Sequence, residues 1–125
     1  MSHSLKRILI VEDDPFILKI LNRNLKSEFE IDSAVTGVEA LQKIHKGDYS
    51  LILLDLVMPE MGGFEVLEQL QQEKIKIPIV VFSNLAQDEE KERALALGAK
   101  AYFVKSDTDI DQVAELIRRG IANKL

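Results

Sequence analysis

Five short strand-like segments alternate along this chain with longer segments of helical periodicity. The strand-like segments cover residues 8–11, 30–35, 49–55, 79–82 and 101–104, and the expected helices cover about 15–25, 38–46, 64–70, 87–97 and 110–122. Such a regular alternation is typical of βα units, which build one parallel sheet with helices packed on its faces. The pattern therefore predicts an α/β fold.

The strand-like segments differ in how apolar they are. Most of them are continuous apolar runs, as expected of central parallel strands that are buried on both faces. Segment 30–35 instead alternates, with Ile31, Ser33 and Val35 on one face and polar or small residues between them. Alternation predicts a half-exposed strand at the edge of the sheet.

The first expected helix illustrates how its start and its buried face can be predicted. Asp14 is of a residue type that caps helix N-termini, and Pro15 follows it at the first helical position. Apolar residues then recur with the spacing of three and four that defines one face of a helix. The expected buried face comprises Phe16, Ile17, Ile20, Leu21 and Leu25.

Size, charge and cysteine content limit the classes of function. A chain of 125 residues and 14.1 kDa fits one domain, expected over 1–125 with its core at about 6–122. Without cysteine, disulfides and thiolate sites are excluded, and a cytoplasmic location is expected. A formal charge of -5 with dispersed acids argues against direct nucleic-acid binding. No apolar run approaches the roughly 20 residues that a membrane span needs. Because the charge distribution disfavours nucleic acid, we expect a protein partner instead.

Polar residues suited to phosphoryl chemistry follow four of the strand-like segments. They are Glu12, Asp13 and Asp14, then Asp55, Ser83 and Lys105. Because parallel strands end at one edge of a sheet, these side chains are expected to converge where open α/β folds bind their ligands. Clustered carboxylates repel one another, and Mg²⁺, which takes one or two carboxylates plus phosphate oxygens, would relieve that repulsion. A carboxylate beside such an ion can attack phosphorus and form an acyl phosphate.

A purely structural role competes with this interpretation at each position. Asp14 is expected to act as a helix cap, because Pro15 follows it. Asp55 is followed by Leu56-Val57-Met58-Pro59, which leaves it no helix to cap. Taken singly, Ser83 is a common turn residue and Lys105 a common solvated one.

Other nucleotide and catalytic sites lack their motifs. No Gly-x-Gly-x-x-Gly follows the first strand and no Gly-x-x-x-x-Gly-Lys phosphate loop is present. His3 and His45 fall in the N-terminal tail and in a helix, away from the expected cluster. Neither histidine is expected to be a metal ligand or a catalytic base.

Four fragments in this order resemble the receiver domain of bacterial two-component response regulators, and the resemblance covers nearly the whole chain. The fragments are Ile8-Leu9-Ile10-Val11-Glu12-Asp13-Asp14, Asp55-Leu56-Val57-Met58-Pro59-Glu60-Met61-Gly62-Gly63, Ser83, and Gly98-Ala99-Lys100-Ala101-Tyr102-Phe103-Val104-Lys105. The resemblance is to the stand-alone, chemotaxis-regulator-like type with a single domain. It implies a flavodoxin-like (βα)5 three-layer sandwich with a parallel sheet of strand order 2-1-3-4-5.

The resemblance also implies roles for single residues. Asp55 would accept the phosphoryl group, Lys105 would pair with one phosphoryl oxygen, and Ser83 would move inward to bond another. Tyr102 occupies the family's rotating aromatic position, so Ser83 and Tyr102 would form the switch. The implied Mg²⁺ ligands are Asp13, Asp55, the backbone carbonyl of Val57, and Glu12 acting through water.

The sequence departs from the family pattern at three positions. Ser106 follows Lys105 where the family usually has a proline with a cis bond; a cis bond before serine would cost about 3 kcal/mol, so a trans bond is expected. Asn84 is larger than the usual alanine or glycine and is expected to affect access to the phosphoryl group and its lifetime. Gly62 replaces a common Asp or Asn, with Gly63 available for a turn of positive φ.

The first functional interpretation is a phosphorylation-activated switch rather than an enzyme, assisting only its own phosphorylation and dephosphorylation. A sensor histidine kinase or a histidine phosphotransfer protein would phosphorylate it. An unidentified output protein would bind the face made by the fourth helix, fifth strand and fifth helix. The alternatives are a phosphorylation-independent docking module, a phosphoryl shuttle of the same fold, and a magnesium-dependent phosphohydrolase. The phosphohydrolase ranks low because Asp55 lacks an obvious second acid or base and the chain has no room for a substrate-selecting cap.

Overall fold

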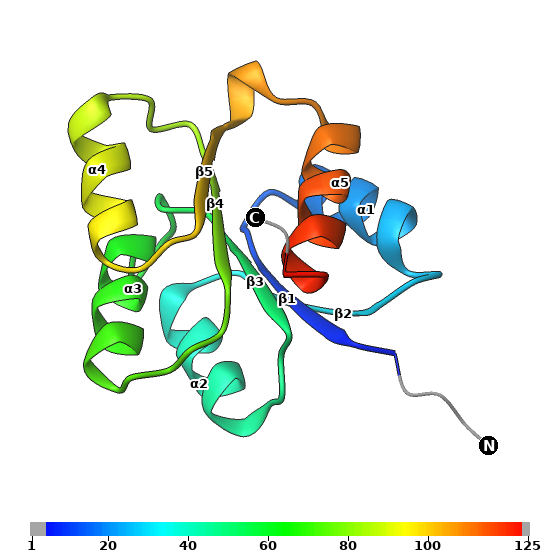
Figure 1. Ribbon diagram of the computed structural model, residues 1–125, viewed down its shortest axis with the longest axis horizontal. Coiled ribbons are helices and arrows are strands. Elements are labelled where there is room, and N and C mark those ends of the chain that lie inside the picture. Colours follow the sequence, from blue (N-terminus) through cyan, green and yellow to red (C-terminus); the bar gives the residue numbers. More distant parts are fainter. Residues whose placement is uncertain (1–4, 124–125) are drawn as a thin grey trace.

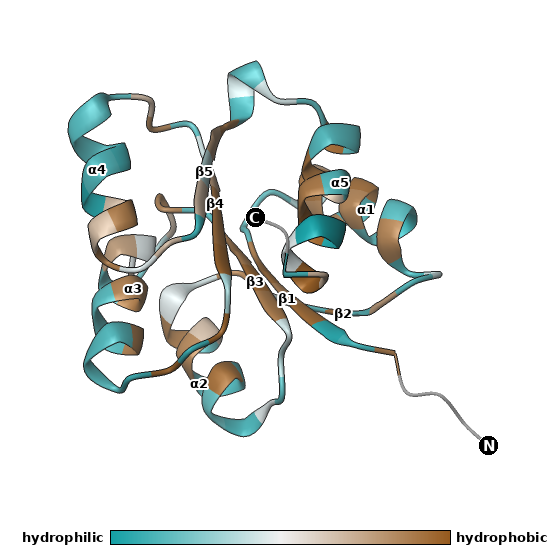
Figure 2. Cartoon of the chain, viewed as in Figure 1, coloured by the Kyte–Doolittle hydropathy of each residue, from teal (hydrophilic) through white to brown (hydrophobic). Residues whose placement is uncertain are grey.

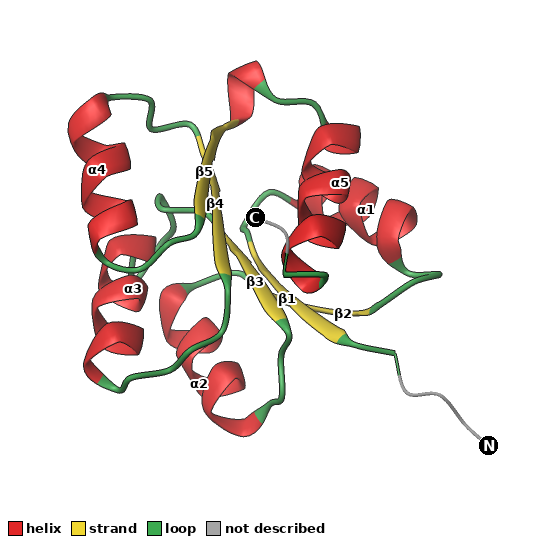
Figure 3. Cartoon of the chain, in the orientation of Figure 1, coloured by secondary structure: helices red, strands yellow, loops and turns green. Residues whose placement is uncertain are grey.

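A computed structural model describes residues 5–123 and places the five strands in one parallel sheet (Figures 1 and 3). The strands are β1 (Arg7–Val11), β2 (Glu30–Ala34), β3 (Leu51–Leu54), β4 (Ile79–Ser83) and β5 (Ala101–Val104). The helices are α1 (Pro15–Leu25), α2 (Gly37–Lys46), α3 (Gly63–Gln72), α4 (Asp88–Ala96) and α5 (Ile110–Ile121), and a 3-10 turn covers Lys105–Asp107. The strand order is β2-β1-β3-β4-β5, which confirms the predicted flavodoxin-like α/β fold.

Two helical layers cover the sheet. Helices α1 and α5 lie on one face and α2, α3 and α4 on the other (Figure 1). Alternate residues of each central strand enter opposite cores: Leu9 and Leu54 pack under α2 and α3, whereas Ile8 and Leu53 pack under α1 and α5. The central strands β1, β3 and β4 are consequently hydrophobic along most of their length (Figure 2), as the continuous apolar runs of the sequence predict. Within residues 5–123, no helix is long and apolar enough to cross a membrane.

Helix α1 has the predicted start but a different buried face. Asp14 is the N-cap and accepts a hydrogen bond from Phe16 N–H at 2.9 Å, as expected. Leu21 and Leu25 are fully buried, but Phe16 is 67% exposed, so its assignment to the core is wrong. At 100° per residue Phe16 lies about 140° around the helix from Leu21, whereas Leu18 lies about 60° from it. Leu18 accordingly packs against this core in place of Phe16.

Strand β2 is the edge strand that the alternating pattern predicts, although it ends at Ala34 and leaves Val35 44% exposed. Polar contacts fix this edge. Asp32 accepts a hydrogen bond of 2.6 Å from the Tyr49 hydroxyl and one of 3.1 Å from Lys43 Nζ. Burial opposes ionisation of Asp32, but the bonds from Tyr49 and Lys43 outweigh it and lower the Asp32 pKa. Charged side chains on an edge strand also discourage pairing with another chain.

The loop between β3 and α3 is shaped by a glycine, but not for the predicted reason. The positive φ in this loop falls at Glu60, with φ of 67°, and the expectation that Gly63 would supply it is wrong. Gly63 is buried instead, and a Cβ there would overlap the carbonyl oxygen of Asp55 and the backbone of Leu56. The glycine is therefore required because helix α3 starts in direct contact with the end of β3.

We expect Gly63→Ala to lower the free energy of unfolding by roughly 1–3 kcal/mol, because the added methyl group must displace backbone atoms. The matched control is Gly62→Ser. A Cβ on Gly62 would lie 3.1 Å from the carbonyl oxygen of Leu56, a contact that a small shift relieves, and serine is a favourable N-cap, so we expect a change below about 1 kcal/mol. Urea unfolding followed by circular dichroism measures both. Equal losses in the two variants would contradict the close-approach explanation.

We expect Asp32→Asn to lower the free energy of unfolding by about 1 kcal/mol at pH 7, because a charged acceptor of three hydrogen bonds, from Tyr49, Lys43 and Ser33 N–H, is lost from a partly exposed site. Since folding lowers the Asp32 pKa, its stabilisation is complete above the ordinary value of 3.8 and is lost as the pH falls below it. The difference between wild type and variant should therefore shrink in urea titrations below that pH.

Asp48→Asn is the control for this titration. Asp48 is exposed, and in the part of the chain that the structure describes its side chain makes no hydrogen bond or ion pair. Its removal should leave stability nearly unchanged at every pH. A difference between wild type and Asp32→Asn that stays constant as the pH falls would refute the assignment to the Asp32 charge.

Candidate functional site

Three carboxylates meet at the edge of the sheet where the strands end. One oxygen from each of Glu12, Asp13 and Asp55 lies within 4.8 Å of the others. The strand register causes this meeting: Val11 pairs with Leu54, so the next residues along β1 and β3 emerge side by side. The backbone extends the ladder by one further bond, from Asp55 N–H to the carbonyl of Val11 at 3.0 Å. The predicted convergence of Glu12, Asp13 and Asp55 is thus a feature of the structure.

Lys105 reaches the same point from the end of β5. Its Nζ lies 2.7 Å from Glu12 Oε1 and 3.0 Å from Asp55 Oδ2, and it stands 5.9 Å above the ring of Phe82. Glu12 and Asp55 are only 2% and 5% exposed, so both ion pairs are shielded from water. Shielded charge pairs interact more strongly than surface pairs and are less screened by salt.

Burial and charge oppose each other in these ion pairs. For Glu12, burial is the largest influence and raises the pKa, against the lowering effects of the Lys105 bond and of the Asp14 N–H; the charge of Asp55 adds to the rise. Burial would lower the pKa of Lys105, but its bonds to Glu12 and Asp55 outweigh burial and raise the pKa instead. Glu12 and Asp55 therefore stabilise the charged form of Lys105.

The residues present fit a divalent cation with oxygen ligands. Three carboxylates face one ammonium group, which leaves two negative charges uncompensated when all of them are ionised. Asp13 is exposed, so an ion could reach the cluster from solvent, while Glu12 and Asp55 are held in place by their bonds to Lys105. A small number of carboxylates with an open, hydrated side is the donor set that Mg²⁺ prefers.

Ser83 and Tyr102 are linked to each other through one residue. Ser83 is fully buried at the end of β4, and its Oγ accepts a hydrogen bond of 3.4 Å from Leu85 N–H. The Tyr102 hydroxyl donates to the carbonyl of Leu85 at 2.7 Å. Leu85 therefore connects the predicted switch residues through its two backbone groups, while Ser83 and the Asp55 carboxylate have separate partners.

Other expected features can be placed beside this site. Val57 N–H donates to Asp55 Oδ1 at 3.3 Å, which puts the residue expected to supply a backbone ligand next to the phosphoacceptor candidate. Asn84 is exposed directly after Ser83. The bond between Lys105 and Ser106 is trans, as expected. His45 lies in α2, where its Nε2 is 2.6 Å from Glu73 Oε1, and it is not part of the cluster of Glu12, Asp13 and Asp55, as predicted. His3 lies outside the described residues.

Two contributors to the site were not predicted. Leu85 acts through its backbone amide and carbonyl, which any residue could supply, so its side chain carried no signal. Phe82 lies beneath Lys105 although its sequence context is that of an ordinary core residue in a buried strand. Only a rule about position, such as the residues flanking Ser83, could have indicated them.

Comparison with known proteins gives the same family at three levels. The model of the response regulator receiver domain matches residues 8–118. The cell cycle response regulator CtrA of Brucella ovis is 38% identical over 118 residues, covering 91% of this chain and 51% of that protein. The chain thus spans about half the length of the curated relatives it matches.

Two solved structures are similar both in fold and in sequence. A CheY-like receiver domain protein from Methanospirillum hungatei superposes with a TM-score of 0.88 at 33% identity, covering 97% of each chain. The response regulator TrrA of Thermotoga maritima, solved in complex with Mg²⁺-BeF, gives a TM-score of 0.80 at 34% identity, covering 93% of this chain and 99% of that one. Receiver domains are signalling modules in which phosphorylation and Mg²⁺ binding are typical. This chain therefore belongs to the response regulator receiver domains of two-component systems.

Proposed function

We propose that the chain is a switch controlled by phosphorylation of Asp55 in the presence of Mg²⁺. The observation that carries the proposal is the position of Asp55: it is 5% exposed at the end of β3, caps no helix, and lies among Glu12, Asp13 and Lys105. A buried carboxylate held beside two others and an ammonium group is arranged for phosphoryl chemistry. The Mg²⁺-BeF complex of the Thermotoga relative supports the same chemistry here.

In this proposal a carboxylate oxygen of Asp55 forms a bond to phosphorus as the phosphorus–nitrogen bond of a phosphohistidine breaks. The donor would be a sensor histidine kinase or a histidine phosphotransfer protein. Lys105 already contacts Asp55 Oδ2, so a phosphoryl group at this position would lie within its reach. The aspartyl phosphate adds acceptor oxygens and roughly one to two negative charges, which the ammonium group stabilises.

The metal is proposed to be held by Asp13, Asp55 and the backbone carbonyl of Val57, with Glu12 acting through water. When bound, Mg²⁺ would supply positive charge that offsets both the carboxylates and the incoming phosphoryl oxygens. The chain itself orients the acceptor: Val57 N–H donates to Asp55 Oδ1 while Lys105 donates to Oδ2, so both carboxylate oxygens are fixed before the reaction. Such preorganisation lowers the barrier without new contacts in the transition state.

The proposed output depends on Ser83 and Tyr102. Movement of the Ser83 side chain toward a phosphoryl oxygen, to which its hydroxyl would donate, would change the 3.4 Å bond that it accepts from Leu85 N–H. The Tyr102 hydroxyl donates to the carbonyl of Leu85. A shift of Leu85 would therefore move Tyr102 and change the surface near β5 and α4. An output protein would read that change on the face formed by α4, β5 and α5. Complete reversal of a 1:99 equilibrium would need about 5.5 kcal/mol of differential affinity.

Helix α4 is suited to reporting such a change. Only Ala94 of this helix is buried, so few core contacts hold it in place. Its polar contacts to α3 come from Arg93, which lies 4.2 Å above the Phe64 ring and 2.7 Å from Glu68 Oε1, and from Gln71 Nε2, which donates to the carbonyl of Ala96 at 3.4 Å. Elements with few buried apolar contacts are those that rearrange at low free-energy cost.

A cytoplasmic location belongs to the same proposal, since the phosphodonor is a partner of that compartment.

We expect incubation with acetyl phosphate and Mg²⁺ to add one phosphoryl group to the wild-type protein and none to Asp55→Asn, because asparagine cannot form the acyl phosphate. Intact-mass spectrometry over time measures the adduct and its decay. Omission of Mg²⁺ should strongly reduce labelling. If neither protein is labelled under conditions that label a known receiver domain, the proposal fails and a phosphorylation-independent docking module takes its place.

We expect Asp13→Asn to weaken Mg²⁺ binding at least about tenfold, because a charged ligand is lost from a site whose affinity depends on carboxylates. Amide chemical shifts of Asp55 and Val57 during a Mg²⁺ titration report the affinity. The neighbouring substitution Asp14→Asn makes the same change of charge, but asparagine is an equally good N-cap, so it should bind Mg²⁺ almost as wild type does. Equal weakening in both variants would indicate a general charge effect.

A further inference from the structure

A second candidate site lies at the other end of the sheet, where strand β4 begins. Between the ends of α3 and α4 and the start of β4, the surface forms an open groove of about 280 Å³. Its apolar wall includes Ile75, Ile77 and Leu97, and three lysines, Lys74, Lys76 and Lys100, stand along it. Ile79 at the groove and Ser83 at the phosphorylation site are the two ends of β4, about 13 Å apart along the strand.

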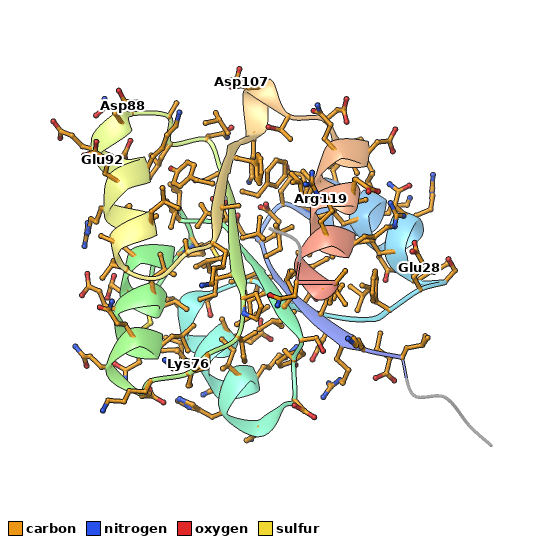
Figure 4. The ribbon with its side chains drawn as sticks, viewed as in Figure 1. Glu28, Lys76, Asp88, Glu92, Asp107 and Arg119 are labelled. Atoms are coloured by element: carbon orange, nitrogen blue, oxygen red, sulfur yellow. The ribbon has the colours of Figure 1, made fainter. Side chains whose placement is uncertain are left out.

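The lysines of this groove are available for a partner. In the part of the chain that the structure describes, none of Lys74, Lys76 and Lys100 forms an ion pair with a carboxylate, although the whole chain carries a net charge of -5. Figure 4 shows Lys76 at the end of the molecule remote from Asp88 and Asp107. Asp88 starts α4, and Asp107 lies in the 3-10 turn that begins at Lys105. The three lysines therefore place positive charge along the apolar wall of the groove.

The backbone at Lys74 is a second and independent sign of function. Lys74 has φ of 57° at the position that follows the C-cap of α3, where the left-handed conformation favours glycine. At the other wall of the groove, Gly98 follows α4 with φ of 108° and satisfies the same backbone requirement without strain. Glu60 and Asn123 adopt the same conformation, but of these three residues only Lys74 lines the groove, where its side chain is placed to meet a partner.

We propose that this groove binds an acidic segment of a partner protein, with apolar side chains of the segment lying on Ile75, Ile77 and Leu97 and its carboxylates facing the three lysines. The groove is open to solvent and is lined by apolar side chains between the ends of two helices, so it can receive the side chains of a segment lying across it. Three separate ammonium groups along an apolar wall match alternating acidic and apolar residues. Because the groove shares no residue with the phosphorylation site, binding of the segment does not require phosphorylation of Asp55.

The test selects peptides from a phage-displayed library of random 12-residue sequences against the wild-type protein, followed by fluorescence anisotropy with the enriched peptides. We expect enrichment of Asp or Glu next to Leu, Ile or Phe. The triple variant Lys74→Gln, Lys76→Gln, Lys100→Gln should bind these peptides at least about tenfold more weakly, and wild-type affinity should fall as salt rises. Peptide binding should shift the amide resonances of Ile77 and Gly98 in the wild-type protein.

The matched control is the triple variant Lys19→Gln, Lys26→Gln, Lys46→Gln, which removes the same charge from exposed positions outside the groove. It should bind within about twofold of wild type, and circular dichroism checks that both triple variants remain folded. Asp55→Asn should bind unchanged, which separates this proposal from the proposed phosphorylation. Enriched peptides without acidic residues, or equal binding by the two triple variants, would overturn it. So would lysine-dependent binding to phosphatidylserine vesicles without binding to peptides, since that identifies a membrane surface instead.

Discussion

The ion pairs of Lys105 with Glu12 and Asp55 hold the functional edge of this molecule together. Removing charges from water is unfavourable, and buried ion pairs seldom add net stability. Their value here is positional, because one ammonium group fixes two carboxylates that would otherwise repel each other and turn toward solvent. The remaining negative charge keeps the site receptive to a cation. One ammonium group beside three carboxylates thus both orients the side chains and leaves negative charge for a cation to offset.

That arrangement depends on the sheet beneath it. The register that pairs Val11 with Leu54 brings Glu12 and Asp55 together, and a slip of one residue would turn the side chains to opposite faces. Two well-filled cores make such a slip costly, since each alternate strand residue would exchange an apolar environment for the wrong helical layer. The glycine at the start of α3 adds a further constraint, because it allows the helix to begin against the backbone of Asp55. Hydrophobic packing therefore sets the positions of the strand ends, and the Lys105 ion pairs orient the carboxylates that the strand ends carry.

The two ends of the strands differ in the charged residues that line their candidate sites. Acidic residues dominate where the strands end, at Glu12, Asp13 and Asp55, and again at the start of α4. Lysines gather where β4 begins, around an apolar groove. A phosphorylation-dependent surface and a permanent docking surface can coexist on one domain if they occupy different edges. Under the two proposals made above, one edge would respond to a signal and the other would keep a partner close.

The sequence by itself determined the order of strands and helices, the edge position of β2, the Asp14 cap, and the convergence of Glu12, Asp13, Asp55 and Lys105 at one edge. These features follow from local periodicity and from the geometry of parallel strands, and both can be read from the types of residue along the chain. Tertiary structure alone decided that Phe16 is exposed, that Gly63 is needed for close approach, that Leu85 joins Ser83 to Tyr102, and that three lysines line one groove. Each of these depends on which atoms of distant segments meet, and backbone contacts and surface shape leave no pattern in the order of residue types.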